Sequence, residues 1–450
     1  MRRRRERGRL GDPAAHDNTA PVADKRRPRG SSPTARRGDV RIHQRERRHT
    51  PPSHRSRERP AMSSTDSKPP FLVFAAPDIQ EPEIAEVEAC LRSGWLGTGP
   101  RVARFESDFA SYKGVAPQLV AGVNSCTAAM HVSMVAAGLP AGSEVITTPL
   151  TFCATVNSIL HADLVPVLAD VDPHTQNIDP DAIEAAITPR TRAILPVHFA
   201  GRPCDMDRIM AIARKHDLLV IEDCAHAIET EYRGAKAGTF GDFGCFSFYV
   251  TKNVVTGEGG MIVGRDAARI ARARTLALHG MSKDAWHRFS DKGYKHYQVV
   301  ESGFKYNMMD LQAAIGLHQL ARVESNWRRR QALWQAYGQA LDGLPLQLPA
   351  APEADTRHAY HLYTVMVDPS RTGIGRDEFL DRMNESGIGT GVHYQSVAEH
   401  PYYQERFGWH PDQWPHARKI GRETVSLPLS SKLADADLAR VADAARRVLA

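Results

Sequence analysis

The sequence GDFGCFSFYVTKNVVTGEGGM occupies residues 241–261. Its first half is apolar and aromatic, its centre holds one lysine, Lys252, and it closes in a predicted glycine-rich turn at Gly257, Gly259 and Gly260. Lysine side chains are mostly exposed, so a lysine beside an apolar run is unusual. Partial burial lowers the pKa of an ammonium group and frees the amine to attack a carbonyl carbon. Taken alone, the pattern favours a surface lysine that follows a buried strand.

Strands and helices alternate along the chain before this segment. Apolar runs rich in β-branched residues are separated by helical patterns, and these runs cover residues 144–149, 164–172, 193–201, 218–227 and 244–250. The alternation predicts an α/β fold with a mostly parallel sheet covered by helices on both faces. In such sheets ligands bind at the carboxyl ends of the strands. Asp223 and Lys252 both fall at such ends.

Composition divides the chain into three predicted parts. Residues 1–61 hold 19 Lys/Arg against 7 Asp/Glu, whereas the rest of the chain has a net charge of −6. The basic segment has few large apolar residues, so residues 1–65 are predicted to be a disordered Arg-rich extension. A large cofactor-binding domain is expected over 66–342. A smaller C-terminal α/β domain is expected over 343–450, after a proline-rich linker, with residues 389–395 as one of its strands.

The basic extension has three interpretations. We favour translation starting at Met62, where ordered-looking sequence begins. A nucleic-acid-binding arm is an alternative, but the extension lacks interleaved aromatic residues. A targeting peptide is the third, but there is no apolar central region and acidic residues interrupt the basic run.

Cysteine spacing and hydropathy exclude several classes of protein. The six cysteines have no CxxC spacing, which predicts reduced core residues of a cytoplasmic protein and no metal site. No apolar run approaches the ~20 residues of a membrane-spanning helix, so no membrane partner is expected.

Three weak signals combine around Lys252. The carboxylate of Asp223 at a strand end could keep a heteroaromatic nitrogen protonated, as pyridoxal phosphate requires to act as an electron sink. The polar turn Ser125–Ala128 between a strand and a helix could hold the phosphate, with Ser247 adding a hydroxyl. Simple capping of that helix by Asn124 or Ser125 is the alternative. In this order the signals are typical of a fold-type-I enzyme that uses pyridoxal phosphate.

Several longer motifs resemble one known family. The strings GWLGTGP, EDCAHA, GTFGDFGCFSFYVTKNVVTGEGGM, SGFKYNMMDLQAAIG and GTGVHYQ are similar to signatures of the DegT/DnrJ/EryC1/StrS aminotransferases. The resemblance runs from about Phe71 to the C-terminus. It implies fold type I, pyridoxal 5'-phosphate as cofactor, and amination of a nucleotide-linked keto sugar.

The resemblance also implies cofactor contacts. Lys252 would form the imine with the cofactor and move the proton during transfer, and Asp223 would pair with the pyridinium nitrogen. His226 would contact the phenolic oxygen and Phe152 would stack on the ring, although either could be a core residue. The phosphate would be held by the Thr127 side chain, the Ala128 backbone and Ser247.

Four further residues follow from the same resemblance. Asn307 would reach the phosphate of the neighbouring subunit's cofactor, which implies a homodimer with shared active sites, although it could also cap the helix after it. Trp95, His393 and Tyr394 would border the sugar-nucleotide pocket, with core packing as the alternative.

The expected reaction moves an amino group from glutamate to the keto sugar, in polysaccharide or glycan precursor synthesis, and the 4-position is favoured over the 3-position. A sugar dehydratase on the same fold and a regulatory DNA-binding member are the alternatives. Members of this fold family that act as dehydratases replace the imine lysine with histidine, so the intact Lys252 favours amino transfer. The basic extension is the only feature that suggests DNA, and nucleic acid is not expected as a partner.

Overall fold

The computed structural model describes residues 70–281 and 297–450. The predicted Arg-rich extension lies outside the described residues. Within the described ranges, none of the helices has both the length and the apolar character needed to cross a membrane.

A seven-stranded sheet organises the larger part of the described chain. Its spatial order is β1-β9-β8-β5-β4-β2-β3. Strand β9 is antiparallel to both β1 and β8 and the other neighbouring pairs are parallel, so the predicted mostly parallel sheet is confirmed. The strands are β1 (Val120–Val123), β2 (Glu144–Thr147), β3 (Val165–Leu168), β4 (Thr191–Leu195), β5 (Leu219–Asp223), β8 (Phe243–Ser247) and β9 (Gly260–Gly264).

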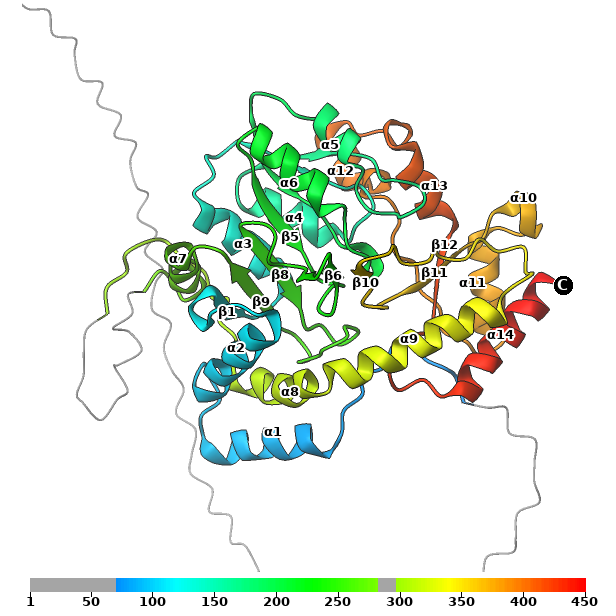
Figure 1. Ribbon diagram of the computed structural model, residues 1–450, viewed down its shortest axis with the longest axis horizontal. Helices are drawn as coiled ribbons and strands as arrows, with labels where there is room; N and C mark the ends of the chain where they lie inside the picture. Colours follow the sequence, from blue (N-terminus) through cyan, green and yellow to red (C-terminus); the bar gives the residue numbers. More distant parts are fainter. Residues whose placement is uncertain (1–69, 282–296) are drawn as a thin grey trace, which may run out of the picture. The chain divides into compact units, whose positions relative to one another are not determined.

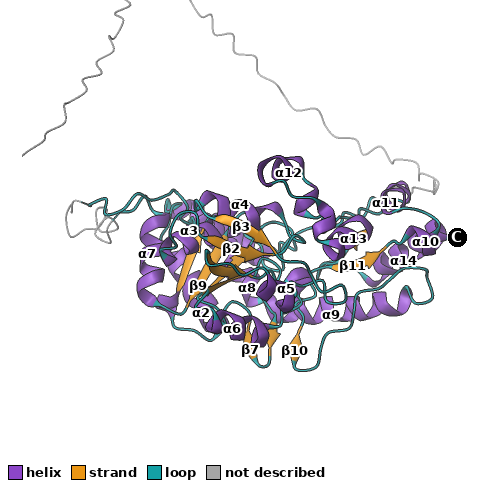
Figure 2. Ribbon diagram, turned by 90° about the horizontal axis from the view of Figure 1, so that it is seen from above, coloured by secondary structure: helices purple, strands orange, loops and turns teal. Residues whose placement is uncertain are grey.

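Helices cover both faces of this sheet (Figure 2), because successive residues of each buried strand point to opposite sides. On β9, Ile262 packs in the core beneath α3, α4 and α7, whereas Met261 and Val263 pack toward α2 and α8. Over β2, β4 and β5 the second face is covered by α5 and α6. These helices are α2 (Pro100–Lys113), α3 (Cys126–Ala137), α4 (Cys153–His161), α5 (Pro180–Ala185), α6 (Met206–Lys215), α7 (Ala267–Ala277) and α8 (Asp310–Ala321).

Strand β9 differs from the sequence expectation, which treated Gly257–Gly260 as a turn alone. Gly257 does turn, with φ +82°, but Gly260 begins a strand that pairs with both β1 and β8. A Cβ atom on Gly260 would lie 2.5 Å from the carbonyl group of Ser125. Glycine is therefore required where β9 passes the start of α3.

A second, two-stranded sheet pairs β11 (Tyr363–Met366) with β12 (Thr424–Leu427). Residues 389–395, expected to be a strand, are irregular and bridge β12 only between Gly391 and Ser426. The core on this sheet combines α11 (Arg376–Glu385) and α14 (Asp435–Leu449) with Leu333 and Tyr337 of α9 (Val323–Ala340). Figure 1 shows α9 running from α8 toward α14. Helix α9 precedes residue 343 but contributes to this core. The domain boundary at 342/343 therefore stays a prediction.

The remaining elements are short or peripheral. A three-stranded sheet has the order β10-β6-β7. Its strands and the other helices are β6 (Glu231–Tyr232), β7 (Ala235–Lys236), β10 (Thr356–Arg357), α1 (Glu81–Ser93), α10 (Pro369–Thr372), α12 (Pro401–Phe407) and α13 (Pro415–Glu423).

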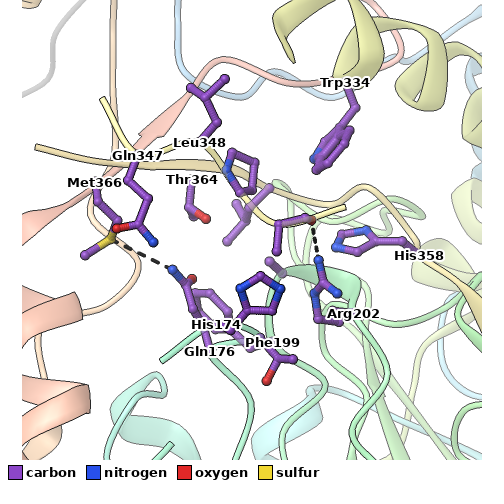
Figure 3. Close-up of a pocket in the computed structure, with 15 residues that line it drawn as sticks. His174, Gln176, Phe199, Arg202, Trp334, Gln347, Leu348, His358, Thr364 and Met366 are labelled. Carbon is purple, nitrogen blue, oxygen red and sulfur yellow. Dashed lines mark hydrogen bonds between the residues drawn. The ribbon is translucent and has the colours of Figure 1, made fainter. Parts of the chain in front are cut away.

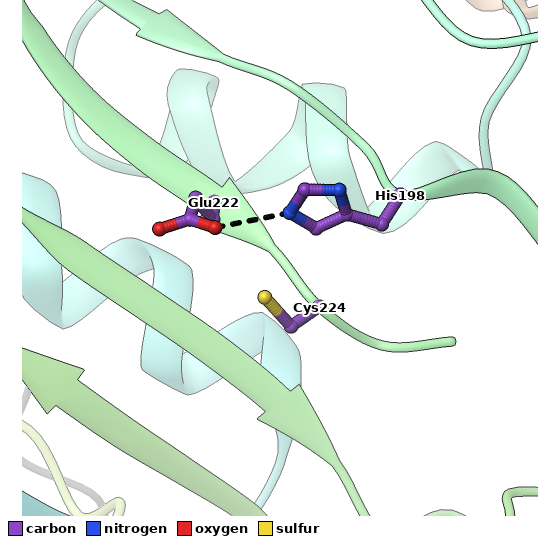
Figure 4. Close-up of side chains that lie close together, drawn as sticks. All are labelled: His198, Glu222 and Cys224. Carbon is purple, nitrogen blue, oxygen red and sulfur yellow. Dashed lines mark hydrogen bonds and ion pairs between the residues drawn. The ribbon is translucent and has the colours of Figure 1, made fainter. Parts of the chain in front are cut away.

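The buried carboxylate of Glu222, which Figure 4 shows facing His198, ties β5 to the loop before β8. It accepts hydrogen bonds from Nε2 of His198 at 3.0 Å and from the backbone N–H groups of Gly238, Phe240 and Gly241 at 2.7 to 2.9 Å. A carboxylate has about four acceptor positions, and these four donors use them.

The same carboxylate belongs to a group that could be mistaken for a metal site. One ligand atom each of His198, Glu222 and Cys224 lies within 4.8 Å of the others. The N–H of Cys204 donates to Nδ1 of His198, so the neutral ring carries its proton on the Nε2 that faces Glu222. Burial also raises the pKa of the Cys224 thiol well above its usual value. The cluster is therefore a hydrogen-bonded anchor of the sheet.

We predict that Glu222→Gln destabilises the protein by about 3 kcal/mol, because an amide nitrogen would face donors that now meet a carboxylate oxygen. Urea unfolding followed by circular dichroism measures this. The matched control is Glu184→Gln, which removes the same charge from an exposed pair with Lys215 and should leave the urea midpoint close to that of the wild type. Equal midpoints for the two variants would contradict the anchoring role of Glu222.

Candidate functional site

A cavity of about 480 Å³ lies at the carboxyl ends of β5 and β8, beside the start of α3. It brings together most of the residues singled out from the sequence. Those that line it are Thr127, Phe152, Asp223, His226, Ser247, Lys252, His393 and Tyr394. Trp95 and Asn307 are not among its lining residues.

Strand pairing explains why Asp223 and Lys252 share this cavity. Asp223 is the last residue of β5 and pairs in parallel register with Cys245 of β8. The chain leaves β8 at Ser247 and turns, with the N–H of Lys252 donating to the carbonyl of Tyr249 at 2.8 Å. Because parallel strands end at the same edge of a sheet, both side chains face one space.

Asp223 is a buried carboxyl group whose hydrogen bonds and nearby charge only partly offset its loss of hydration. Its oxygens accept hydrogen bonds from the Thr155 hydroxyl at 2.9 Å and the Ala225 N–H at 3.0 Å. Burial raises the pKa of Asp223 above its usual value, although these two bonds and the charge of Lys252 act in the opposite direction. A protonated ring nitrogen in the cavity would supply the charge that favours the carboxylate.

Lys252 has the opposite imbalance. Burial lowers the pKa of its amine to about 8, and the nearby acidic groups of Asp223 and Cys126 oppose that shift only in part. The unprotonated amine, which is the form that adds to an aldehyde, is therefore more abundant near neutral pH than for an ordinary exposed lysine, although it is still the minor form at pH 7.

The start of α3 holds both features that the sequence suggested. The Ser125 side chain caps the helix by accepting the Ala128 N–H at 3.1 Å, so the capping alternative is observed. The expected phosphate contact through the Ala128 backbone would have to share this N–H. Thr127 and Ser247 line the cavity beside it. Hydroxyls and helix N-terminal N–H groups suit a phosphate.

The aromatic residue Phe152 is 57% exposed, which excludes the alternative that it is a core residue. Its ring lies 6.0 Å from that of Tyr394 across the cavity edge. A flat aromatic ligand could therefore lie against it.

His226 is buried and has partners within its own chain. Nδ1 accepts the N–H of Ala200 at 3.2 Å, so the Nε2 proton faces the Tyr394 hydroxyl at 3.0 Å. Burial lowers the pKa of His226 well below its usual value, and the ring is neutral. His226 thus has the bonds expected of a satisfied core histidine while it still lines the cavity. His393 lies nearby, bonded to the Ser426 hydroxyl at 2.8 Å, and burial lowers its pKa to about 4.

Trp95 and Asn307 lie together elsewhere on the same chain. Nε1 of Trp95 donates to the carbonyl of Thr98, and Nδ2 of Asn307 donates to the Thr98 hydroxyl at 2.7 Å. Trp95 is 50% exposed, and its neighbours Leu96 and Met309 are exposed apolar side chains. We call Trp95, Leu96, Asn307 and Met309 the outer patch.

Sequence reasoning missed several residues that support the site. Thr155 bonds Asp223, while Asn253 and His361 bond each other at 3.0 Å next to Lys252. Asn253 could have been noticed because it follows Lys252 directly. Thr155 and His361 come from segments with no distinctive motif.

A second cavity, of about 240 Å³, is lined by residues from the segments 199–202 and 358–366 among others (Figure 3). Arg202, Trp334 and His358 line it, and Arg202 is already paired with Glu353. The described residues that line it include no lysine, cysteine or carboxylate, so the reactive groups lie in the first cavity.

Known proteins give the same picture. The model of the DegT/DnrJ/EryC1/StrS aminotransferase family matches residues 77–446. The spore coat polysaccharide biosynthesis protein SpsC of Bacillus subtilis is 46% identical over 380 residues, which cover 84% of this chain and 97% of SpsC.

Solved structures of sugar aminotransferases superpose well. The putative sugar aminotransferase Spr1654 of Streptococcus pneumoniae in its PMP form has a TM-score of 0.78 at 30% identity, covering 84% of this chain and 98% of that one. Helicobacter pylori PseC, an aminotransferase of pseudoaminic acid biosynthesis, has a TM-score of 0.78 at 26% identity, covering 84% and 99%. The predicted fold class is confirmed, and the chain belongs to the DegT/DnrJ/EryC1/StrS aminotransferase family.

Proposed function

We propose that this protein is a cytoplasmic, pyridoxal-phosphate-dependent aminotransferase that moves an amino group from glutamate to a nucleotide-linked 4-keto sugar. The observation that carries the proposal is the shared cavity of Asp223 and Lys252, in which a buried carboxyl group and an amine of lowered pKa face each other. Spr1654, a neighbour in structure, has been solved in both PLP and PMP forms, which supports the cofactor.

The residues of the cavity fit this cofactor. When bound, pyridoxal phosphate withdraws electrons from the carbon that carries the amino group. Asp223 would hold the proton on the ring nitrogen, and Phe152 would lie against the ring. Thr127 and Ser247 would bind the phosphate beside the start of α3. His226 also lines the cavity, and its Nε2 proton points to the Tyr394 hydroxyl.

Lys252 would have two tasks. Its unprotonated amine would bind the cofactor aldehyde, and after release it would carry a proton between the cofactor carbon and the sugar carbon as a general acid and base. A pKa of about 8 places this amine near the value that suits both directions of proton transfer at neutral pH.

The substrate assignment rests on the cavity and on relatives. His393 and Tyr394 are the residues from the C-terminal region of the chain that line the cavity. The sugar would bind beside them. SpsC is named for polysaccharide biosynthesis and PseC for pseudoaminic acid biosynthesis, so a sugar acceptor in glycan precursor synthesis is the proposal that fits both.

A homodimer with shared active sites is part of the proposal. Asn307 and Trp95 lie outside the cavity of their own chain, on the outer patch with exposed Leu96 and Met309. The Asn307 side-chain oxygen is buried and has no hydrogen-bond partner among the described residues. If a second copy of the chain covers this patch, Asn307 and Trp95 of the first chain would lie at the cavity of the second copy.

We predict that Lys252→Ala abolishes the visible absorption band of the bound cofactor and lowers amino transfer by at least about 1,000-fold, because the amine both binds the aldehyde and moves the proton. Absorption spectra and a glutamate half-reaction measure this. Lys215→Ala, at an exposed lysine, is the control and should behave as wild type. An unchanged band in the Lys252 variant would contradict the assignment.

The substrate class is tested with a panel of nucleotide-linked 4-keto and 3-keto sugars and glutamate as donor. We expect a 4-amino sugar from the 4-keto substrate, together with one 2-oxoglutarate per turnover. Release of water without consumption of glutamate would instead identify a dehydratase. Amination of only the 3-keto sugars would contradict the ring position.

Shared sites predict complementation between two impaired variants. Lys252→Ala and Asn307→Ala chains, coexpressed with different tags, form heterodimers in which one site has Lys252 from one chain and Asn307 from the other. About one quarter of wild-type activity should return in the statistical mixture. If Asn307 serves its own chain, no activity returns.

A further inference from the structure

Lys252 lies in a turn with few fixed contacts. Residues 250–255 belong to no strand or helix. The last two of them, Val254 and Val255, are buried. Among residues 250–255, Asn253 is the one whose side chain forms hydrogen bonds. Besides the bond from the Lys252 N–H to the Tyr249 carbonyl, the side-chain bonds of Asn253 therefore help to hold the Lys252 backbone in place.

The neighbours of Asn253 determine which way its amide points. Nδ2 donates to Glu229 at 2.9 Å and to the carbonyl of Ala359 at 3.1 Å. Both are acceptors, so the Asn253 oxygen must face Nδ1 of His361, 3.0 Å away. Burial lowers the pKa of His361 well below its usual value, so the neutral ring holds its single proton on Nδ1.

Glu229 is held in turn by Arg330 of α9. Their side chains form an ion pair and both are almost fully buried. Nε of Arg330 also donates to the Ala359 carbonyl at 3.5 Å. A buried ion pair leaves the carboxylate little freedom to turn, which keeps the Asn253 amide in one orientation.

His361 is fixed by its backbone and its ring. Its N–H donates to the Ala200 carbonyl at 3.1 Å, while the Ala200 N–H donates to His226. The rings of His361 and His226 lie 4.3 Å apart. Ala200 has φ +55°, an uncommon value for a residue with a side chain, which persists only where the surroundings hold it.

We propose that His361 is a positioning residue for Lys252: its Nδ1–H holds the Asn253 oxygen, and the Arg330–Glu229 pair holds the other end of the same amide. This chain of contacts links α9 and the segment before β11 to the turn that carries the reactive amine. The inference rests on the proposed function, since it concerns how Lys252 is presented to the cofactor and substrate.

The test compares His361→Phe, which keeps an aromatic ring but removes the donor, with His361→Asn, whose amide N–H replaces Nδ1–H. For the Phe variant we expect kcat to fall about tenfold or more, because small displacements of a reacting group cost that much. KM for glutamate should stay within threefold, and the visible circular dichroism per bound cofactor should change. The Asn variant should return to within threefold of wild type in all three. His358→Asn, at a buried histidine of the same segment, is the matched control and should equal wild type.

A double-mutant cycle with Glu229→Gln tests the chain of contacts, because the glutamine amide would turn Asn253 and present its N–H to His361. If both variants act through Asn253, the double variant is no worse than the more impaired single variant. Any of three results would overturn the inference. The losses in kcat of the two single variants could multiply in the double variant, the His361→Phe variant could equal the wild type, or the His361→Asn variant could be as impaired as His361→Phe. Absence of a visible cofactor band in wild type would instead reject the proposed function.

Discussion

The parallel pairing of β5 with β8 is the constraint on which the site depends. It ends both strands at one edge of the sheet, so Asp223 and the turn after β8 meet there. The residue before Asp223 points the opposite way, and that residue, Glu222, binds three backbone N–H groups of the loop that leads into β8. Consecutive residues of one strand thus have separate tasks. Glu222 aligns the strands, and Asp223 faces the cavity.

The electrostatics of the cavity explain why a cationic heteroaromatic aldehyde suits it. Burial makes the Asp223 carboxylate less favourable and the Lys252 ammonium less favourable, since each lacks full hydration. The ring nitrogen of the proposed cofactor, when protonated, would compensate the Asp223 carboxylate, and its aldehyde would react with the unprotonated amine of Lys252. The exposed ring of Phe152, which lines the cavity, offers an aromatic face to a flat ligand.

Local pattern was sufficient to predict the alternating strands and helices, Asp223 at a strand end and Lys252 after another. The prediction of a turn alone was wrong for the glycine-rich end of the segment, because Gly257 turns the chain but Gly260 begins β9. Local pattern also failed at residues 389–395, where β-branched and aromatic residues lie beside β12 without pairing as a strand. The contact of Asn253 with His361 spans 108 residues and depends on the tertiary fold, so no local signal announces it. Family motifs assign roles to Trp95 and Asn307, but neither lines the cavity of its own chain, and the proposed dimer would be needed to bring them to a cavity.

The central claim is that Lys252 binds the cofactor covalently. Reduction of the purified protein with borohydride, followed by proteolysis and mass spectrometry, tests it most directly, because reduction makes a bond between amine and cofactor permanent. The account predicts a single modified peptide containing Lys252, with the added mass of the reduced cofactor on that residue. Modification at another lysine, such as buried Lys113, or no stoichiometric modification at all, would contradict it.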